Sequence, residues 1–478
     1  MRRRLDHDRP HHDEKGSHAE SHRQLRSRAR RVLHRPHARR AGRGPACRAH
    51  HVGGAHRART RRHRRARPGA QRVHHRGRRR CDGRRPAGRR RAVPRRRPGP
   101  AAGLPIGVKD VIMVKGLPAT MGSRHFAGHV SDADAACVTL LREAGAVIVG
   151  MTNTHEFAYG PTGDRSAAGP ARNPRDTTRM PGGSSSGSAV AVAAGMVPLA
   201  LGTDTGGSVR IPAALSGATG FKPAYGALPA DGVFPLSKTL DHVGLLARDA
   251  QDCLVAYRAL VPGHRQPRSA PPGAGRPRVA WFDPGAVFPC DPRVVRTTRQ
   301  VLEAAAGPVP ERRLSRRDAD DLHETFVSIQ SHEVIEVHAG RMAQAPGLFD
   351  DEVLERLRAA ATVPARRYAR AMRARTRLAE AVRLLFGHDD VLAMPTVPIT
   401  APELGRRELD VNGTPVAVRD ALLALTSPWN VLGLPALSIA AGTVDGLPVG
   451  LQLVCRPGRE HLLFQTAALC TSTGEVHA

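Results

Sequence analysis

Apolar positions follow two alternating patterns between residues 101 and 472. Apolar residues at helical spacing predict helices, and short β-branched apolar runs between Gly and Pro predict buried strands. The predicted helices span 132–146, 187–195, 292–306, 318–343, 350–386 with a break near Pro364, and 459–472. The predicted strands span 146–150, 197–202, 278–282 and 391–397, followed by a strand pair at 435–442 and 447–454. This alternation predicts an α/β fold with a central sheet and helices on its faces.

The first hundred residues lack this pattern. They contain no Phe, Trp, Tyr or Ile, but they hold 13 of the chain's 24 His residues. They also hold 35 of the 74 Lys and Arg residues and only 6 of the 42 Asp and Glu residues, which accounts for most of the net charge of +32. Such a segment cannot bury enough apolar surface to offset the entropy lost on ordering. We therefore predict no fold for residues 1–97 and one domain over residues 98–478.

Two interpretations of residues 1–97 stay open. The first is a disordered basic tail that binds nucleic acid. The second is a frameshifted reading of an ordinary N-terminal region. Runs such as RARTRRHRRARPGAQRVHHRGRRR (57–80) contain no Lys and no acidic residue, and their Arg, Pro, His, Gly and Ala are what GC-rich codons yield out of phase. The second interpretation predicts that another frame of the DNA encodes an Ala- and Leu-rich amphipathic helix.

The rest of the chain is nearly neutral, so nucleic-acid binding is not expected of it. Its longest uncharged apolar stretch, 189–201, has 13 residues, fewer than the roughly 20 of a membrane-spanning helix. No apolar signal core follows the N-terminal arginines. The seven Cys residues form no CxxC pair, and their odd number argues against a disulfide framework. These features predict a cytoplasmic protein without a membrane segment.

The stretch PGGSSSGSAVAVAAG (181–195) carries six Gly and Ser residues before a small-residue helix. A phosphate-binding loop would need a Lys after Gly187, and none is present. The segment GSSSG formally matches the GxSxG turn of α/β-hydrolases, with Ser185 as nucleophile. That turn requires a strand directly before it, and residues 175–181 do not predict one.

A second Gly-rich loop, LGTDTGGSVRIPAA (201–214), directly follows a predicted strand. Two Gly residues before Ser208 allow backbone N–H groups to converge on one point, since no Cβ intervenes. Such a nest binds anions and can serve as an oxyanion hole. Ser208 would then be placed to attack a carbonyl group, although a tight turn without chemistry is the alternative for an isolated Gly-rich loop.

A serine nucleophile needs a base, and the lysines of the chain supply candidates. Only five of the 74 basic residues are Lys. Arg stays protonated in proteins, whereas a buried Lys can lose its proton. Lys109 lies in the apolar run LPIGVKDVI, where desolvation should lower its pKa. Lys222 is the rival base, but we expect it to cap carbonyl groups beside Pro223. Lys115 and Lys238 lie next to turns and are expected at the surface.

These segments together resemble the amidase signature family, the Ser–cis-Ser–Lys amidohydrolases. The resemblance rests on four stretches and covers 99–472. They are GLPIGVKD (103–110), the block from NPRDTTRMPGGSSSG to GFKPAYG (173–226), VLAMPTVPITAP (391–402), and GLPALSIAAG with GLPVGLQLV (433–454). The resemblance implies the amidase-signature fold, in which helices cover both faces of a central mixed β-sheet. The family's N-terminal helices have no counterpart in the pattern of residues 1–97.

The resemblance also implies the site. Ser208 corresponds to the nucleophile, Ser184 to a bridging serine that follows a cis peptide bond from Gly183, and Lys109 to the general base. The backbone N–H groups of Thr205, Gly206, Gly207 and Ser208 correspond to the oxyanion hole. The implied reaction cleaves a carboxamide C–N bond through an acyl-enzyme, with no cofactor and no metal. Consistent with this, HEVIEVH (332–338) has its His residues six positions apart, so that they do not share a helix face.

Three functions follow as alternatives. The first is a stand-alone amidase with a small-molecule amide substrate, as a monomer or a homodimer. The second is the A subunit of a glutamyl-tRNA amidotransferase, which shares the Lys and two Ser residues and works in a complex. The third is an inactive homologue with a nucleic-acid-binding basic tail. The near-neutral charge of the remaining chain argues against this last alternative.

Overall fold

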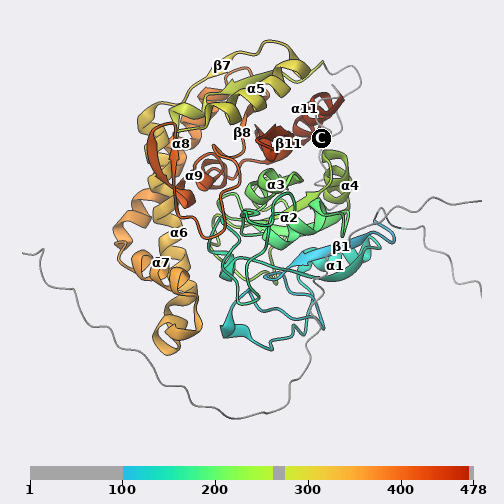
Figure 1. Ribbon diagram of the computed structural model, residues 1–478, viewed down its shortest axis with the longest axis vertical. Coiled ribbons are helices and arrows are strands. Elements are labelled where there is room, and N and C mark those ends of the chain that lie inside the picture. The colour runs from blue at the N-terminus through green and yellow to red at the C-terminus, as the bar shows by residue number, and fades with distance from the viewer. Residues whose placement is uncertain (1–98, 100, 262–274, 473–478) are drawn as a thin grey trace, which may run out of the picture. The chain divides into compact units, whose positions relative to one another are not determined.

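The computed structural model describes residue 99 and residues 101–261 and 275–472, and Figure 1 shows the arrangement of their elements. Residues 1–97, for which the sequence predicts no fold, lie outside the described residues. The centre of the fold is a ten-stranded sheet. In sheet order, its strands are β2 (Val147–Thr152), β1 (Pro105–Lys109), β3 (Leu199–Asp204), β5 (His242–Ala247), β4 (Thr219–Lys222), β11 (Ala436–Val444), β12 (Leu447–Cys455), β8 (Val391–Pro395), β6 (Val279–Phe282) and β7 (Glu311–Arg312).

The sheet is mixed, as the resemblance implies. The strands at its two ends run parallel to their neighbours: β1 pairs in parallel with β2 and β3, and β6 with β7 and β8. The central strands, from β3 through β5, β4, β11 and β12 to β8, pair antiparallel. The sheet therefore has a parallel region at each end and an antiparallel centre.

Helices cover both faces of the sheet, which confirms the predicted α/β fold. Alternate residues of β3 show the two layers, because Leu199 and Leu201 join one apolar cluster and Ala200 joins another. The first cluster includes residues of α1 (Ala136–Glu143), α4 (Ala250–Leu260), α5 (Pro292–Ala306) and α11 (Glu460–Ser472). The second includes residues of α2 (Ser186–Ala193) and α3 (Arg210–Ser216). A strand that is covered on both faces tends to carry apolar residues at successive positions, which explains the apolar residues 199–201 at the start of β3.

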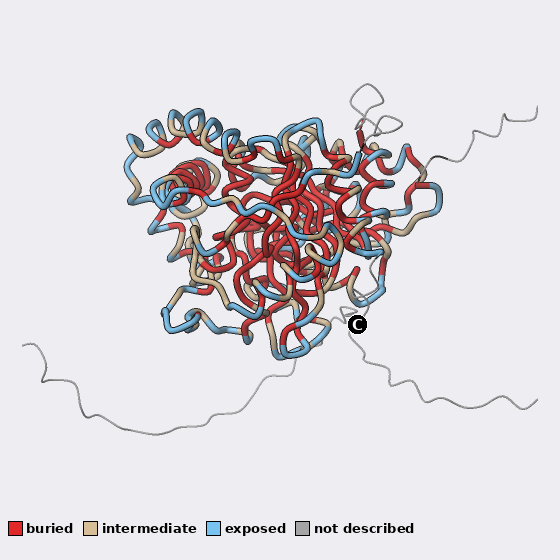
Figure 2. The backbone as a smooth tube through the Cα atoms, turned by 90° about the horizontal axis from the view of Figure 1, so that it is seen from above, coloured by how far each residue is buried: buried red, intermediate tan, exposed pale blue. Residues whose placement is uncertain are grey.

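A third apolar cluster joins the sheet to a further group of helices. These are α6 (Arg316–Gln344), α8 (Ala365–Phe386), α9 (Val418–Ala424) and α10 (Ser427–Val431), and α7 (Asp351–Ala361) packs on α6. A two-stranded hairpin of β9 (Glu408–Val411) and β10 (Thr414–Ala417) precedes α9. Buried residues fill the interior of the fold, and exposed residues follow its outer turns (Figure 2).

Most predicted elements match the structure within a few residues. The break near Pro364 is the boundary between α7 and α8, and the predicted strand pair is the antiparallel hairpin of β11 and β12. One expectation is wrong, because the run 146–150 is not a buried strand. It forms β2 at the edge of the sheet, where Val147 and Val149 are 51% and 57% exposed. An apolar run indicates a strand, but it does not say whether neighbouring elements cover it.

Candidate active site

Lys109 occupies the last position of β1, a strand that lies between β2 and β3. Its side chain is fully buried. Its Nζ donates hydrogen bonds to two hydroxyl groups, Ser184 Oγ and Thr203 Oγ1, at 2.7 Å each. The sequence resemblance links Lys109 with Ser184, and the structure brings these two residues into direct contact. Thr203, which the sequence analysis did not single out, is the second acceptor.

Burial lowers the pKa of Lys109 to about 7, from an ordinary value of 10.5. The negative charges of Asp204 and Asp241 oppose this effect without cancelling it. Desolvation disfavours a charged ammonium group because the protein interior replaces its hydration poorly. A large fraction of Lys109 is therefore neutral at physiological pH and able to accept a proton.

Ser184 lies in a tightly packed loop between residues 181 and 185. The peptide bond from Gly183 to Ser184 is cis, as the resemblance implies. The Ser184 carbonyl oxygen accepts hydrogen bonds from the N–H of His155 (3.1 Å) and the hydroxyl of Thr154 (3.2 Å). A Cβ at Gly183 would come within 2.7 Å of the Gly163 nitrogen, so this position has room for Gly alone. The loop and its neighbours thus hold the Ser184 hydroxyl toward Lys109.

Ser208 lies in the loop that joins β3 to α3 and is 6% exposed. Its carbonyl oxygen accepts a hydrogen bond from the Ser185 N–H at 3.1 Å, which joins the two Ser loops. Within the described chain, its hydroxyl makes no hydrogen bond, and in particular none to Ser184. The structure therefore places Ser208 next to the Ser184 loop and leaves its hydroxyl available to a substrate.

The loop before Ser208 requires its two Gly residues. A Cβ at Gly206 would lie 2.6 Å from Phe326 Cζ, and one at Gly207 would lie 2.3 Å from Thr426 Oγ1. Gly207 also has a φ of 133°, which L side chains rarely adopt. The N–H of Gly207 already donates to Asp204 Oδ1 at 2.8 Å. The N–H groups of Thr205, Gly206 and Ser208 are therefore better candidates for binding an oxyanion than the N–H group of Gly207, which the resemblance also includes.

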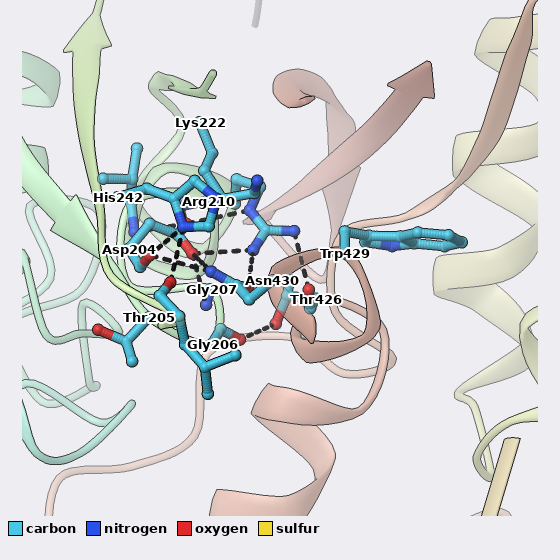
Figure 3. Close-up of polar contacts among 12 residues, drawn as sticks. Asp204, Thr205, Gly206, Gly207, Arg210, Lys222, His242, Thr426, Trp429 and Asn430 are labelled. Carbon is cyan, nitrogen blue, oxygen red and sulfur yellow. Dashed lines mark hydrogen bonds and ion pairs between the residues drawn. The ribbon is translucent and has the colours of Figure 1, made fainter. Parts of the chain in front are cut away.

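A buried ion pair stabilises this loop. Arg210 donates to both carboxylate oxygens of Asp204, with Nη2 2.9 Å from Oδ1 and Nε 3.0 Å from Oδ2. The same carboxylate accepts the N–H groups of Gly207 and Val209. Figure 3 shows Arg210 between Asp204 and the segment that carries Asn430, whose amide also donates to Asp204 Oδ1 at 2.8 Å. One carboxylate thus organises the backbone on both sides of Ser208.

The opposite side of the loop is held by residues far along the chain. Thr426 donates its hydroxyl to the Gly206 carbonyl oxygen at 2.6 Å, and its own carbonyl oxygen accepts from Arg210 Nη1 at 3.0 Å. Arg210 Nη1 also donates to Gln452 Oε1 at 2.7 Å, on β12. Sequence reasoning missed Asp204, Arg210 and Thr426. The only available signal was that Asp204 and Arg210 flank the Gly-rich loop.

The profile of the family described as Amidase matches residues 84–464 of this chain. The chain belongs to the Amidase family. The glutamyl-tRNA(Gln) amidotransferase A chain of Symbiobacterium thermophilum is 37% identical over 407 residues, which cover 77% of this chain and 82% of that protein. The AtzE component of the 1-carboxybiuret hydrolase of Pseudomonas sp. strain ADP is 34% identical over 399 residues, which cover 78% and 85%.

Solved structures of family members share the fold. The structure of 6-aminohexanoate cyclic dimer hydrolase complexed with substrate matches with a TM-score of 0.70 and 30% identity, covering 78% of this chain and 86% of that one. A crystal structure of an amidase matches with a TM-score of 0.72 and 33% identity, covering 78% and 85%. The relatives are thus enzymes that act on amide C–N bonds, as the sequence resemblance implies.

Two other candidates from the sequence have structural roles in this Amidase-family fold. Ser185 donates to the Thr203 carbonyl oxygen at 3.1 Å and accepts from the Thr203 N–H at 3.3 Å. No strand precedes it between residues 173 and 185, so the α/β-hydrolase turn is ruled out. Lys222 donates to the carbonyl oxygens of Leu434 (2.5 Å) and Pro223 (3.2 Å). It caps carbonyl groups, as predicted.

The described residues hold no group of three or more His, Cys, Asp or Glu side chains that could bind a metal ion. The two His residues of HEVIEVH have different environments on α6. His332 stacks on Tyr368, and His338 is buried against Phe157. In the same described ranges, no helix combines the length and the apolar character that crossing a bilayer requires.

Proposed function

We propose that this chain hydrolyses a carboxamide with Ser208 as the nucleophile, Ser184 as the bridging serine and Lys109 as the general base. The observation that carries the proposal is the buried 2.7 Å contact between Lys109 Nζ and Ser184 Oγ. A lysine that is desolvated to a pKa of about 7 and bound to a serine hydroxyl matches the requirement for an activated nucleophile. Family membership supports the same chemistry.

The reaction begins when neutral Lys109 takes the proton of Ser184, and Ser184 takes that of Ser208. The Ser208 oxygen then bonds to the carbonyl carbon, and the carbonyl oxygen becomes an oxyanion. The N–H groups of Thr205, Gly206 and Ser208 stabilise that charge, a term worth about 3–4 kcal/mol per donor in other enzymes. The C–N bond breaks as Ser184 gives a proton to the leaving nitrogen and takes one back from Lys109.

The second half of the reaction reverses the relay. The acyl group is now an ester of Ser208, and ammonia or an amine has left. A water molecule gives a proton to Ser184, which passes its own proton to Lys109, and the water oxygen bonds to the ester carbonyl carbon. The Ser208 oxygen leaves with a proton from Ser184, and Lys109 returns its proton to Ser184, which releases the carboxylic acid and restores the resting site.

The test is the mass of the acyl-enzyme. The purified full chain is mixed with an activated anilide or amide and quenched in acid within seconds. Mass spectrometry is expected to show the acyl adduct on the peptide that contains Ser208. An adduct on a Ser185 peptide, or amide hydrolysis that persists in Ser208→Ala, would contradict the assignment.

The A component of a glutamyl-tRNA amidotransferase is the second candidate, favoured by the 37% identity to such a protein. Under this alternative, amide hydrolysis would depend on partner proteins, because that component works in a complex. Size-exclusion chromatography with light scattering, together with ammonia release by the isolated chain, separates the two. An active monomer or homodimer supports the stand-alone amidase. A chain that is active only with partner proteins supports the alternative.

We further propose that the protein acts in the cytoplasm. The described cysteines Cys137, Cys253, Cys290, Cys455 and Cys470 form no disulfide, and free thiols persist in a reducing compartment. Cell fractionation followed by immunodetection tests this placement.

A further inference from the structure

Two helices pack against Gly206 in the loop of residues 205–208, which we call the oxyanion loop. A Cβ at Gly206 would lie 2.6 Å from Phe326 Cζ of α6 and 3.1 Å from Leu423 Cδ2 of α9. Residues four apart lie one above the other on a helix face. One turn from Phe326 lies Gln330, and one turn from Leu423 lies Arg419. Arg419 Nη2 donates to Gln330 Oε1 at 3.2 Å, so these two side chains also meet.

Arg419 has no close carboxylate, unlike the other arginines around it. Glu352 lies 2.8 Å from both Arg356 and Arg407. For Arg419, the nearest carboxylate contact is 3.8 Å, to Asp420, whose side chain is 47% exposed. Arg419 Nε is buried and has no hydrogen-bond partner among the described residues. A buried guanidinium N–H without an acceptor is costly unless a ligand supplies one.

We propose that Arg419, with Gln330, binds a carboxylate of the substrate, so that the substrate is a carboxamide that also carries a carboxylate. The inference rests on the proposed function and names its substrate class. Arg presents several donors in one plane, which suits a carboxylate. The Gln330 amide nitrogen can donate as well. Gln330 and Arg419 each lie one helical turn from a residue that packs against Gly206, which suits the monoamide of a short dicarboxylic acid.

The kinetic test compares glutaramate with pentanamide, which have the same carbon chain with and without the carboxylate. The wild-type chain is expected to favour glutaramate in kcat/KM by at least about tenfold, since charge-assisted pairs are strong. Arg419→Gln is expected to bring that ratio close to one and to leave kcat/KM for pentanamide within about twofold. Arg419→Lys should keep part of the preference. Arg383→Gln, at an exposed arginine of α8, should change neither value and is the matched control.

A binding test separates this inference from the proposed function. Ser208→Ala is titrated with glutaramate by calorimetry, alone and combined with Arg419→Gln. The inference expects the dissociation constant to rise about tenfold in the double variant. An unchanged dissociation constant, or an unchanged glutaramate preference in Arg419→Gln, overturns the carboxylate site even if amides are hydrolysed. Tight glutaramate binding without hydrolysis by the wild-type chain would support the site and contradict the proposed function.

Discussion

Arg210 and Asp204 form an ion pair in which neither side chain is exposed, with Arg210 Nη2 2.9 Å from Asp204 Oδ1. Arg210 is also bound to Thr426, Gln452 and Asn430. Burying two charges costs free energy, and this cost is met only when the remaining donors and acceptors are paired. The pair therefore ties the loop that carries Ser208 to segments more than 200 residues away.

Arg210→Met is expected to lower the free energy of unfolding by about 3–5 kcal/mol, because it leaves Asp204 as an unpaired buried charge. Urea denaturation at pH 7 measures the change. Arg383→Met is the control, since Arg383 pairs with Glu380 at the surface and such pairs contribute about 0–1 kcal/mol. Equal losses in the two variants would contradict a special role for the buried pair.

The same variant should reverse the pH dependence of stability. Burial alone would raise the pKa of Asp204, but the charge and hydrogen bonds of Arg210 lower it below its usual value. A carboxyl group with a lowered folded pKa contributes stability above its unfolded pKa of about 3.9, and this contribution is lost as the pH falls. In Arg210→Met, burial dominates and the pKa rises, so acidification from pH 7 to 5 should stabilise the variant. Stability curves of both proteins across this range check the sign.

The pKa of Lys109, about 7, sets the expected pH profile of activity. The general base must be neutral, so kcat/KM should rise with pH and level off above a midpoint near 7. Lys109→Ala is expected to lose at least about a thousandfold in kcat/KM, as does the removal of catalytic residues elsewhere. Lys238→Ala is the control, because Lys238 is 67% exposed and pairs with Glu336. A profile that does not change between pH 5 and 9 would exclude a titrating lysine base.

Substitutions of Ser185 and Ser208 should have opposite effects on stability and on catalysis. Ser208→Ala is expected to abolish turnover and to leave the unfolding midpoint almost unchanged, because the Ser208 hydroxyl has no partner in the described chain. Ser185→Ala leaves the N–H and carbonyl oxygen of Thr203 without this partner and should cost about 1–3 kcal/mol of stability. Activity should fall only mildly. Steady-state assays and thermal unfolding of both variants test this. Loss of turnover in Ser185→Ala together with normal turnover in Ser208→Ala would mean that Ser185 is the nucleophile.

The local sequence was sufficient for most of the fold. Helical spacing and short apolar runs located the long helices and the hairpin of β11 and β12, because each is defined by its own residues. The helices α3 and α4 and the central strands β4 and β5 were not predicted. The seven residues of α3, for example, offer too little periodicity. Val147 and Val149 were expected to be buried, because an apolar run does not report whether another element covers it.

The candidate site was accessible from the sequence only in part. Lys109, Ser184 and Ser208 could be named from the scarcity of lysine, the Gly-rich loops and the family resemblance. The residues that hold their loops in place could not be named, because the contacts join distant segments of the chain. Thr426, for example, lies 220 residues from Gly206. A threonine in the short turn between α9 and α10 carries no local sign of such a contact.

Thr426→Val is expected to lower kcat about 10- to 100-fold, because it removes the hydroxyl that holds the Gly206 carbonyl oxygen at 2.6 Å while keeping the side-chain volume. The Gly206 peptide orients the oxyanion loop, and losing one donor there costs about 3–4 kcal/mol in other enzymes. KM should change little, since the contact acts on the transition state. Thr426→Ser restores the hydroxyl and should recover most of kcat. Equal kcat losses in the two variants would show that Thr426 acts through packing rather than through this hydrogen bond.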